Sequence, residues 1–498
     1  MSRTMSELGR FLSEAVKIVG HERVVTEAAA LQRYERAPLV EGVPPGAIVR
    51  PSSSDQVATL VKLARQSRVN LVLSSSDLRR RTRGDTVPAA AGVIVDLSGM
   101  DRIVRMDRRN KVALIEPGVT FPRLIAAADE AGMKAHQPLL PPRGKSVIAS
   151  YLEREPVLIP KYHWDMADPL LCTELVFGTG EVFRTGSAAG PGTLEQQWSV
   201  GVAQNTLSGP GQSDLVRLVQ GAQGTIAAVT WATVKLEVKP AVQRFHFVPS
   251  PKLSRLVEFA YRALRRRLCD EFLILDARAL ATVLADDPAR IDALVAKQAP
   301  YTLIYSVSGY KYFPEERVAW QEQALAAIAR QAAVEPLQAI PGCSAKRIGT
   351  LLGAPSPEPY YKLRPKGGFV DIVFLTTLDR VHAFIETLET EAHRLGSPRE
   401  SVGAYLQPIQ QGRALHAEFS LYYDPADEAD TNRMKQLHHA VTRRLADAGA
   451  FFSRPYGPVA DLAYARCPDT QDVLRKMKRL FDPDHILNRG KLCFGEAA

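Results

Sequence analysis

The sequence has little cysteine, no long apolar run and no stretch of low complexity. Its five cysteines are scattered through 498 residues without a Cys-x-x-Cys pair, which argues against a disulfide framework and against a cysteine-only zinc or iron–sulfur site. Nowhere do about 18 uncharged apolar residues follow one another, and the first residues lack the apolar core of a signal peptide. We therefore expect a cytoplasmic protein without direct membrane insertion.

Nucleic-acid binding is not expected, although the formal net charge is +9. The basic clusters at residues 79–83, 102–111 and 265–267 lie far apart in the sequence, and aromatic residues do not alternate with them. We find no DNA- or RNA-binding motif. The positive charge instead suits an anionic cofactor, an acidic substrate or an acidic partner subunit.

The length predicts more than one domain. A chain of 498 residues is too long for one ordinary core, and its hydrophobic content of 46% is enough to fill two or three. Residues 5–35 are predicted to be helical. Residues 47–73 follow a strand, helix, strand pattern, with Ser53 and Gln56 spaced as a capping box. After Pro240, strand-like runs alternate with long amphipathic helices, which predicts a second, α+β domain with an antiparallel sheet.

Residues 71–88 form a candidate anion site. An apolar run ends at Leu73, and three serines and four arginines follow before the next apolar run. Hydroxyl groups, backbone N–H groups and guanidinium groups at the end of a strand are suited to holding a phosphate or another anion. The alternative is a solvated basic loop.

Five segments, in this order along the chain, carry a family resemblance. They are residues 48–57 (IVRPSSSDQV), 116–120 (EPGVT), 174–186 (ELVFGTGEVFRTG), 218–225 (LVQGAQGT) and 481–491 (FDPDHILNRGK). Together the segments resemble the flavin-binding oxidoreductases of the vanillyl-alcohol oxidase and p-cresol methylhydroxylase superfamily. Within that superfamily, the chain resembles the glycolate and D-lactate dehydrogenase-like branch in particular.

The resemblance implies an α+β protein with an FAD-binding domain of the p-cresol methylhydroxylase type. Residues 1–240 would form this domain from two α/β subdomains, residues 241–451 an α+β cap domain with an antiparallel sheet, and residues 452–498 a tail that returns to the FAD domain. The implied activity is that of an FAD-dependent dehydrogenase or oxidase, or a subunit of one, acting on a small hydroxylated, anionic substrate. The implied assembly is a homo- or hetero-oligomer with a related flavin subunit or an electron acceptor.

The sequence departs from the family pattern at its flavin loops. The glycine-rich loop expected after Leu73 is replaced by residues 74–83, which contain no glycine, and the glycine pair expected within residues 145–150 is absent. Ala227 stands where glycine is usual, and residues 488–491 (NRGK) replace Asn-Pro-Gly-Lys. Two hypotheses follow. Either serines and arginines hold FAD in place of the glycines, or the chain is a catalytically silent paralogue that has lost flavin and scaffolds a hetero-oligomeric redox complex.

The first hypothesis assigns the cofactor to a defined set of residues. They are Ser74, Ser75, Ser76, Asp77, Arg79, Arg81, Thr82, Lys145, Ser146, Ser150, His163, Gly221, Gly224, Thr225, Asn488 and Lys491. His163 either contacts or covalently binds flavin, or is a plain loop histidine, and we expect FAD to be held non-covalently. The His-x-x-Gly-Asp segment typical of the hydroxy-acid branch is absent, so no metal site is predicted.

The candidate catalytic residues are His416, Glu418, Arg454 and Tyr456. His416 and Glu418 alternate along a predicted strand and therefore share one face. We assign His416 as the base and Glu418 as the group that orients it; the alternative is a core histidine or a solvated sheet face. Arg454 and Tyr456 are predicted to bind a substrate carboxylate or flavin, and the alternative is interdomain packing. Residues 360–364 are a weaker candidate in the cap domain, with a structural role as the favoured interpretation, and the histidines at 438–439 are interpreted as surface residues.

Overall fold

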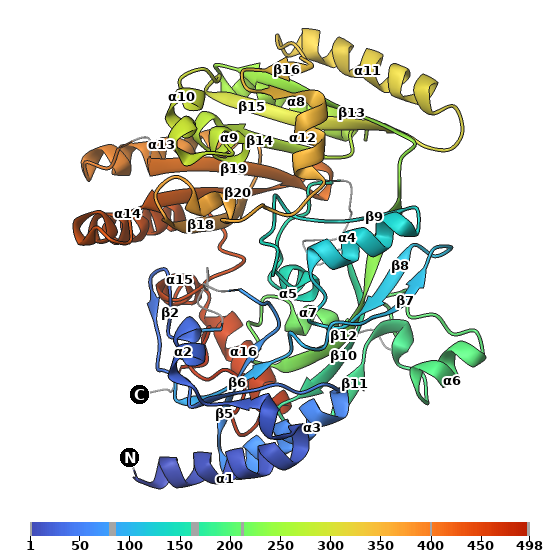
Figure 1. The fold of residues 1–498 in the computed structure, drawn as a ribbon. Coiled ribbons are helices and arrows are strands. Elements are labelled where there is room, and N and C mark those ends of the chain that lie inside the picture. Colours follow the sequence, from blue (N-terminus) through green and yellow to red (C-terminus); the bar gives the residue numbers. More distant parts are fainter. Residues whose placement is uncertain (1, 79–85, 161–168, 211–213, 399–400, 496–498) are drawn as a thin grey trace.

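The computed structural model describes residues 2–78, 86–160, 169–210, 214–398 and 401–495. Figure 1 shows a lower half that contains α1 (Ser2–Val19) and an upper half built on one large sheet. The chain passes from the lower to the upper half between β12 (Ala227–Val238) and β13 (Val242–Ser250). The predicted domain boundaries at residues 240 and 451 stay predictions. Within the described ranges, every helix is too short or too polar to cross a bilayer.

The first sheet of the lower half is mostly parallel. Its strands, in spatial order, are β1 (Val24–Val25), β4 (Ala47–Val49), β6 (Gly92–Asp96) and β5 (Asn70–Ser74). Both β4 and β5 pair in parallel with β6, which lies between them. The predicted strand, helix, strand unit is therefore present, with α3 (Ser54–Ser67) as its crossover helix.

The capping and the extent of the first helices differ from the predictions. Ser53 caps α3 and accepts a hydrogen bond from the Gln56 N–H, but the Gln56 side chain accepts from the N–H of Ser52 at 2.8 Å rather than from Ser53. The predicted helical region 5–35 is one continuous helix only as far as the end of α1, because Gly20, with φ of 95°, follows its last residue. Only short elements follow, including α2 (Ala28–Leu31).

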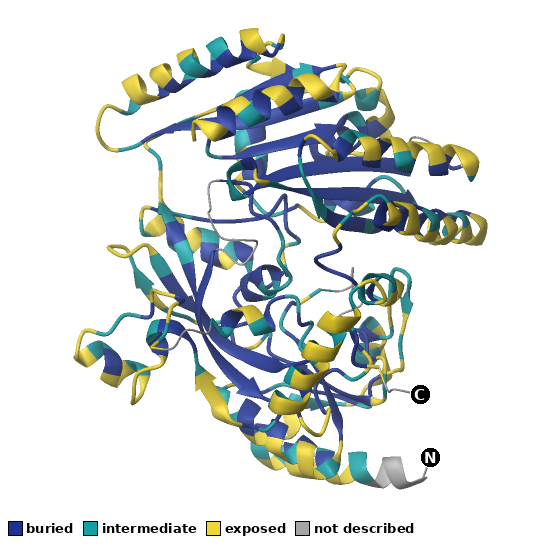
Figure 2. Ribbon diagram, turned by 180° about the vertical axis from the view of Figure 1, so that it is seen from behind, coloured by how far each residue is buried: buried dark blue, intermediate teal, exposed yellow. Residues whose placement is uncertain are grey.

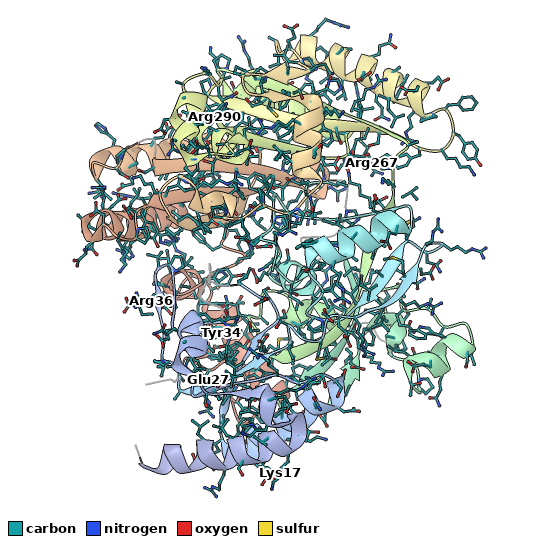
Figure 3. All side chains as sticks on the ribbon, viewed as in Figure 1. Lys17, Glu27, Tyr34, Arg36, Arg267 and Arg290 are labelled. Atoms are coloured by element: carbon teal, nitrogen blue, oxygen red, sulfur yellow. The ribbon has the colours of Figure 1, made fainter. Side chains whose placement is uncertain are left out.

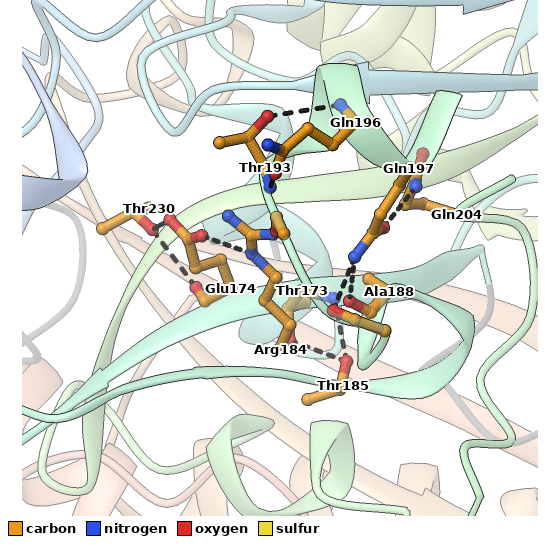
Figure 4. Close-up of polar contacts among 12 residues, drawn as sticks. Thr173, Glu174, Arg184, Thr185, Ala188, Thr193, Gln196, Gln197, Gln204 and Thr230 are labelled. Carbon is orange, nitrogen blue, oxygen red and sulfur yellow. Dashed lines mark hydrogen bonds and ion pairs between the residues drawn. The ribbon is translucent and has the colours of Figure 1, made fainter. Parts of the chain in front are cut away.

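The second sheet of the lower half is antiparallel. Its strands are β11 (Val182–Arg184), β10 (Leu170–Phe177), β12, β8 (Val112–Ile115) and β7 (Ile103–Asp107), with β9 (Met133–Ala135) paired to the end of β12. Residues 178–180 (GTG) predict a tight turn between two strands, and β10 and β11 form this hairpin. Glu174 on β10 accepts hydrogen bonds from Arg184 and Thr230 (Figure 4), and each donor–acceptor distance is 2.8 Å. Burial alone raises the pKa of Glu174, but hydrogen bonds, including these two, leave it below its ordinary value.

The upper sheet is antiparallel, and a separate hydrophobic core packs against each of its two faces. Its strand order is β13, β15 (Tyr301–Gly309), β14 (Phe272–Asp276), β19 (Val402–Ile409), β20 (Ala414–Tyr423) and β18 (Gly368–Thr376). One face packs against α8 (Leu253–Arg265), α11 (Pro314–Gln331), α13 (Val381–Arg394) and α14 (Glu428–Asp447). Part of the other face packs against α9 (Ala277–Leu284) and α12 (Ala345–Leu352). Figure 2 shows the strands buried and the outer helix faces exposed.

The end of the chain returns to the lower half. After α15 (Pro458–Tyr464) and α16 (Pro468–Phe481), the Leu71 N–H donates to the Ile486 carbonyl at 2.7 Å, and the Asn488 N–H donates to the Leu71 carbonyl at 2.8 Å. The tail therefore lies beside β5, next to the serine run. On its other side β5 pairs with β6, which in turn pairs with β4 at the start of the first family-like segment.

Candidate functional site

A cavity of about 980 Å³, counting its open mouth, lies at the end of β5. We call it the lower cavity. Its walls are mainly apolar, with Leu73, Ile148, Leu152 and Val219 among them. The predicted site residues that line it are Ser74, Ser75, Ser76, Lys145, Gly221, Gly224 and Tyr456. Its size and mixed lining are typical of a small-molecule or cofactor site.

The serine run is fixed to the start of α5 (Val147–Leu152). Ser74 ends β5, and loops at the carboxyl ends of parallel strands are common ligand sites. The Ser76 hydroxyl accepts from the Ser146 N–H at 3.0 Å. The Ser146 hydroxyl caps α5 by accepting from Ala149 and donates to the Pro117 carbonyl. Ser146 thus supports the cavity wall from behind.

At two glycines the wall of the lower cavity is formed by backbone atoms. Gly221 and Gly224 have φ of 72° and 69°, a region that favours glycine. A Cβ on Gly221 would lie 3.1 Å from Cζ of Arg154, so this position is also crowded. The Thr225 hydroxyl donates to the Ala222 carbonyl at 2.6 Å and closes the turn. The structure places both predicted cofactor residues at the wall of the lower cavity, and their contacts with the cofactor stay predictions.

Three more of the predicted cofactor residues near the lower cavity are held by protein partners. Nζ of Lys145 lies 2.6 Å from Oε1 of Glu153, and the Ser150 hydroxyl donates to Glu155. The Asn488 side chain donates to the Gln223 carbonyl at 2.6 Å. Lys145 therefore has a carboxylate partner at the cavity wall.

Other predicted cofactor residues lie away from these walls or cannot be placed. Asp77 is exposed and lies 3.5 Å from Nη1 of Arg33, while Lys491 is buried. Arg79, Arg81, Thr82 and His163 lie outside the described residues, as do Arg80 and Arg83. Their predicted contacts with the cofactor stay predictions.

Two further cavities lie above the lower one. The inner cavity, of about 380 Å³, is lined by Pro138, Leu139, Pro141, Pro142, Glu155, Pro156, Tyr360, Tyr361, Lys362, Tyr405, Glu418 and Arg454. The middle cavity, of about 560 Å³, shares Arg454 with the inner cavity and Tyr456 with the lower cavity. Asp371 and His438 also line the middle cavity. The three cavities are therefore neighbours, with Arg454 between the inner and middle cavities and Tyr456 between the middle and lower cavities.

A buried ion cluster lies on the face of the upper sheet that borders these cavities. The Lys362 ammonium donates to Glu418, and its Nζ lies 2.8 Å from Oδ2 of Asp371. Ser420 donates to the other oxygen of Asp371 at 2.7 Å. Burial would lower the pKa of Lys362, but Asp371 and Glu418 raise it above its ordinary value. The cluster consequently contains one cation and two acidic groups.

The two acids of the cluster differ. Burial raises the pKa of Glu418, but Lys362 and His416 outweigh this and hold it well below its usual range. For Asp371 burial prevails and the pKa is raised, although Lys362 opposes the shift. Burial lowers the pKa of His416 to about 4, so its ring is neutral near pH 7. Glu418, which faces the inner cavity, is therefore the stronger acid of the two.

His416 lies behind the inner cavity. Its Nε2 is 3.6 Å from Oε2 of Glu418 and has no hydrogen-bond partner in the described part of the chain. The ring also packs edge-on against Tyr405, with centroids 5.9 Å apart. The shared strand face of His416 and Glu418 is present, but only Glu418 borders the cavity.

Arg454 is a buried cation whose donors are not fully used. The residue is 4% exposed, and neither Nε nor Nη1 has an acceptor among the residues that the structure describes. A buried guanidinium without a full set of acceptors is unfavourable. Because Arg454 borders both upper cavities, an anion there would supply the missing acceptors.

Sequence reasoning missed part of this site. Lys362 was interpreted as structural and Asp371 was not singled out, although a lone acid inside the apolar run 369–375 is a usable signal. The surface prediction for the histidine pair is wrong for His438, which is 5% exposed, and correct for exposed His439. Over the described ranges, no three His, Cys, Asp or Glu side chains gather as a metal site.

Comparisons with known families and proteins agree with this architecture. Residues 45–186 match the family model for the FAD binding domain, and residues 239–492 match that for the C-terminal domain of FAD linked oxidases. Glycolate oxidase subunit GlcD of Bacillus subtilis is 26% identical over 216 residues, which are 42% of this chain and 41% of that protein. The match thus spans less than half of that relative.

Two comparisons extend over nearly the whole chain. D-2-hydroxyglutarate dehydrogenase of Stutzerimonas stutzeri is 23% identical over 496 residues, covering 97% of this chain and 98% of that protein. The structure of p-cresol methylhydroxylase with substrate bound superposes with a TM-score of 0.83 at 18% identity, covering 98% of this chain and 97% of the other. These likenesses confirm the predicted α+β fold and the predicted resemblance.

Proposed function

The chain belongs to the FAD-linked oxidases, and from this premise we propose that it oxidises a small hydroxylated anion. FAD is the cofactor of this family and accepts the hydride in such an oxidation. The residues proposed here do the rest: they hold the cofactor, bind the anion and take up the hydroxyl proton.

The lower cavity fits FAD. The backbones of Gly221 and Gly224 line it together with Ser74, Ser75 and Ser76 at the end of β5, and backbone N–H groups and hydroxyls suit a pyrophosphate. We propose that these groups bind the phosphates. Apolar side chains such as Ile148 and Leu152 suit the planar ring system.

The observation that carries the substrate proposal is Arg454. Arg454, whose Nε and Nη1 lack acceptors among the described residues, lines the inner and middle cavities, next to the lower cavity. A carboxylate accepts two parallel N–H bonds from a guanidinium, which fixes its orientation as well as its position. Two relatives are named for hydroxy acids, glycolate and D-2-hydroxyglutarate, which supports a hydroxy acid here.

Glu418 is the proposed acceptor of the hydroxyl proton. It borders the inner cavity together with Arg454, whereas His416 lies behind it. This exchanges the roles first assigned to the two residues. His416 would position Glu418 and, being neutral, would not add a second positive charge beside Lys362.

The test is anaerobic reduction of the flavin by a panel of small 2-hydroxy acids. The purified chain, loaded with FAD, is mixed with each acid without oxygen, and the loss of the oxidised-flavin absorbance is followed. We expect at least one 2-hydroxy acid to bleach the flavin faster than alcohols of the same size without a charge. A chain that neither contains nor takes up FAD would instead support the silent, scaffolding paralogue.

A further inference from the structure

Oxidation of a hydroxyl group by hydride transfer leaves one proton behind in a buried cavity at each turnover. We propose that Lys362 and Asp371 carry this proton from Glu418, out of the inner cavity and into the middle cavity. This inference rests on the proposed function. It assigns a role in proton transfer to Lys362 and Asp371, which are not needed for hydride transfer itself.

The backbone brings the three groups into a row. Glu418 on β20 is paired with Val373 of β18, and Ser420 is paired with Asp371, so the two acids lie on one face of adjacent strands. Lys362, from the short helix Tyr361–Leu363, reaches between them and contacts both. Glu418 borders the inner cavity and Asp371 the middle cavity. The ammonium of Lys362 therefore contacts one acid at the inner cavity and one at the middle cavity.

Each transfer in this row conserves atoms and charge. The substrate O–H bond breaks and its proton binds Glu418, while the electron pair of the breaking C–H bond leaves with the hydride to FAD. Lys362 then gives one proton to Asp371 and takes the proton from Glu418, so it remains an ammonium. The net result is an ionised Glu418, ready for the next substrate, and a neutral Asp371.

The environments of the two acids favour this direction. The pKa of Glu418 is held well below its ordinary value and that of Asp371 is raised, so a proton is more stable on Asp371. One ammonium and two carboxylates also carry a net charge of about −1, so the cluster accepts one proton without becoming positive. The acid nearest the substrate thus regains its charge.

The middle cavity leads towards the surface. It shares Pro38, Leu39, Val40 and His438 with a surface groove of about 1760 Å³. Arg36, one of the residues lining the groove, lies at the edge of the molecule between its two halves (Figure 3). A proton released from Asp371 therefore has a short route to solvent.

The groups that face Asp371 come from several elements. Lys362 approaches from its short helix, Glu418 and Ser420 from β20, and His438 of α14 hydrogen-bonds the Asp371 backbone. Arg454 borders the same cavity. Burial lowers the pKa of His438 to about 4, so this ring is neutral near pH 7 and Arg454 and Lys362 are the cations that favour proton release.

The experiment separates the first turnover from the following ones. Asp371→Asn keeps the shape of the side chain but removes the proton acceptor, and the fastest hydroxy acid of the panel serves as substrate. Flavin reduction and proton release are followed together in weak buffer with a pH-indicator dye. We expect first-turnover reduction to stay within about threefold, because Glu418 stores one proton, while steady-state turnover and proton release slow about 10- to 100-fold.

Asp430→Asn is the matched control. Asp430 is also a buried acid beside a lysine, with Lys366 Nζ at 3.3 Å, but it lies at the start of α14 and is paired with Arg433. We expect this variant to keep both rates. Lys362→Met gives a second test, and it should show the same split between first and later turnovers.

The outcomes of this experiment are decisive. Unchanged steady-state turnover and synchronous proton release in Asp371→Asn would overturn the proposal. An equal loss of first-turnover and steady-state rates would also overturn it, because it would show a purely structural role. If the wild-type chain shows no flavin reduction at all, the proposed function fails first. If the Lys362→Met variant does not fold, the Asp371→Asn variant alone tests the proposal.

Discussion

Lys478 and Asp482, one turn apart at the end of α16, form an ion pair whose side chains are 1% and 0% exposed. Lys478 also donates to the carbonyls of Thr225 and Leu487, at 2.6 Å and 2.9 Å. Asp482 accepts from the N–H groups of Ile486 and Leu487. One buried pair therefore fastens the returning tail to the segment that carries Gly221 and Gly224.

Removing the cation of this pair should destabilise the protein strongly. Lys478→Met leaves Asp482 charged and unpaired in the interior, and we expect a loss of about 3–5 kcal/mol in the free energy of unfolding. Urea unfolding followed by circular dichroism measures it. Lys476→Met, on the exposed side of the same helix, is the control and should change stability by less than about 0.5 kcal/mol. Equal effects would contradict a structural role for the pair.

Gly178 should not tolerate a methyl group. A Cβ on this residue would lie 2.3 Å from Oδ1 and 2.5 Å from the Cβ of Asp482. Gly178→Ala is therefore expected to cost about 1–3 kcal/mol through overpacking. Gly99→Ala is the control, since a Cβ there meets no atom within 4 Å. Thermal unfolding of both variants tests the prediction, and a neutral Gly178→Ala would show that Asp482 can move aside.

Acid should weaken the fold partly through His438. Burial lowers its pKa from 6.5 to about 4. As the pH falls from about 6.5 to 4, the unfolded chain binds a proton that the folded chain rejects, so this contribution to stability is lost in that window and present above it. When the pH falls from 7 to 4.5, we expect the free energy of unfolding of His438→Gln to decrease by about 2 kcal/mol less than that of the wild type. Urea unfolding of both proteins at both pH values tests this prediction. An identical decrease in the free energy of unfolding would show that His438 titrates normally.

Much of the local structure follows from the sequence, because it depends on neighbours along the chain. The Ser53 cap, the β10–β11 hairpin and the glycines at 221 and 224 are examples. Strand β19 is hard to predict from the sequence, since Gly403, Gln407 and Pro408 interrupt its apolar pattern.

The candidate site depends on contacts that no local pattern contains. Lys362 meets Asp371 and Glu418 only because its helix packs beside β18 and β20. Which acid faces the cavity, and that Arg454 is buried with unused donors, likewise follow from the packing of distant segments. The family resemblance identified the fold, but it did not assign these contacts.

The central claim is that Arg454 selects an anionic substrate, and the most direct measurement compares a 2-hydroxy acid with its neutral amide. For the wild type we predict that the acid reduces the flavin with the higher kcat/KM. Arg454→Gln should lower the value for the acid about 30- to 1000-fold and leave the amide nearly unchanged. Arg454→Lys should retain part of the preference, because a lysine keeps the charge but not the paired bonds. An unchanged preference for the acid in Arg454→Gln, with FAD still bound, would contradict the claim.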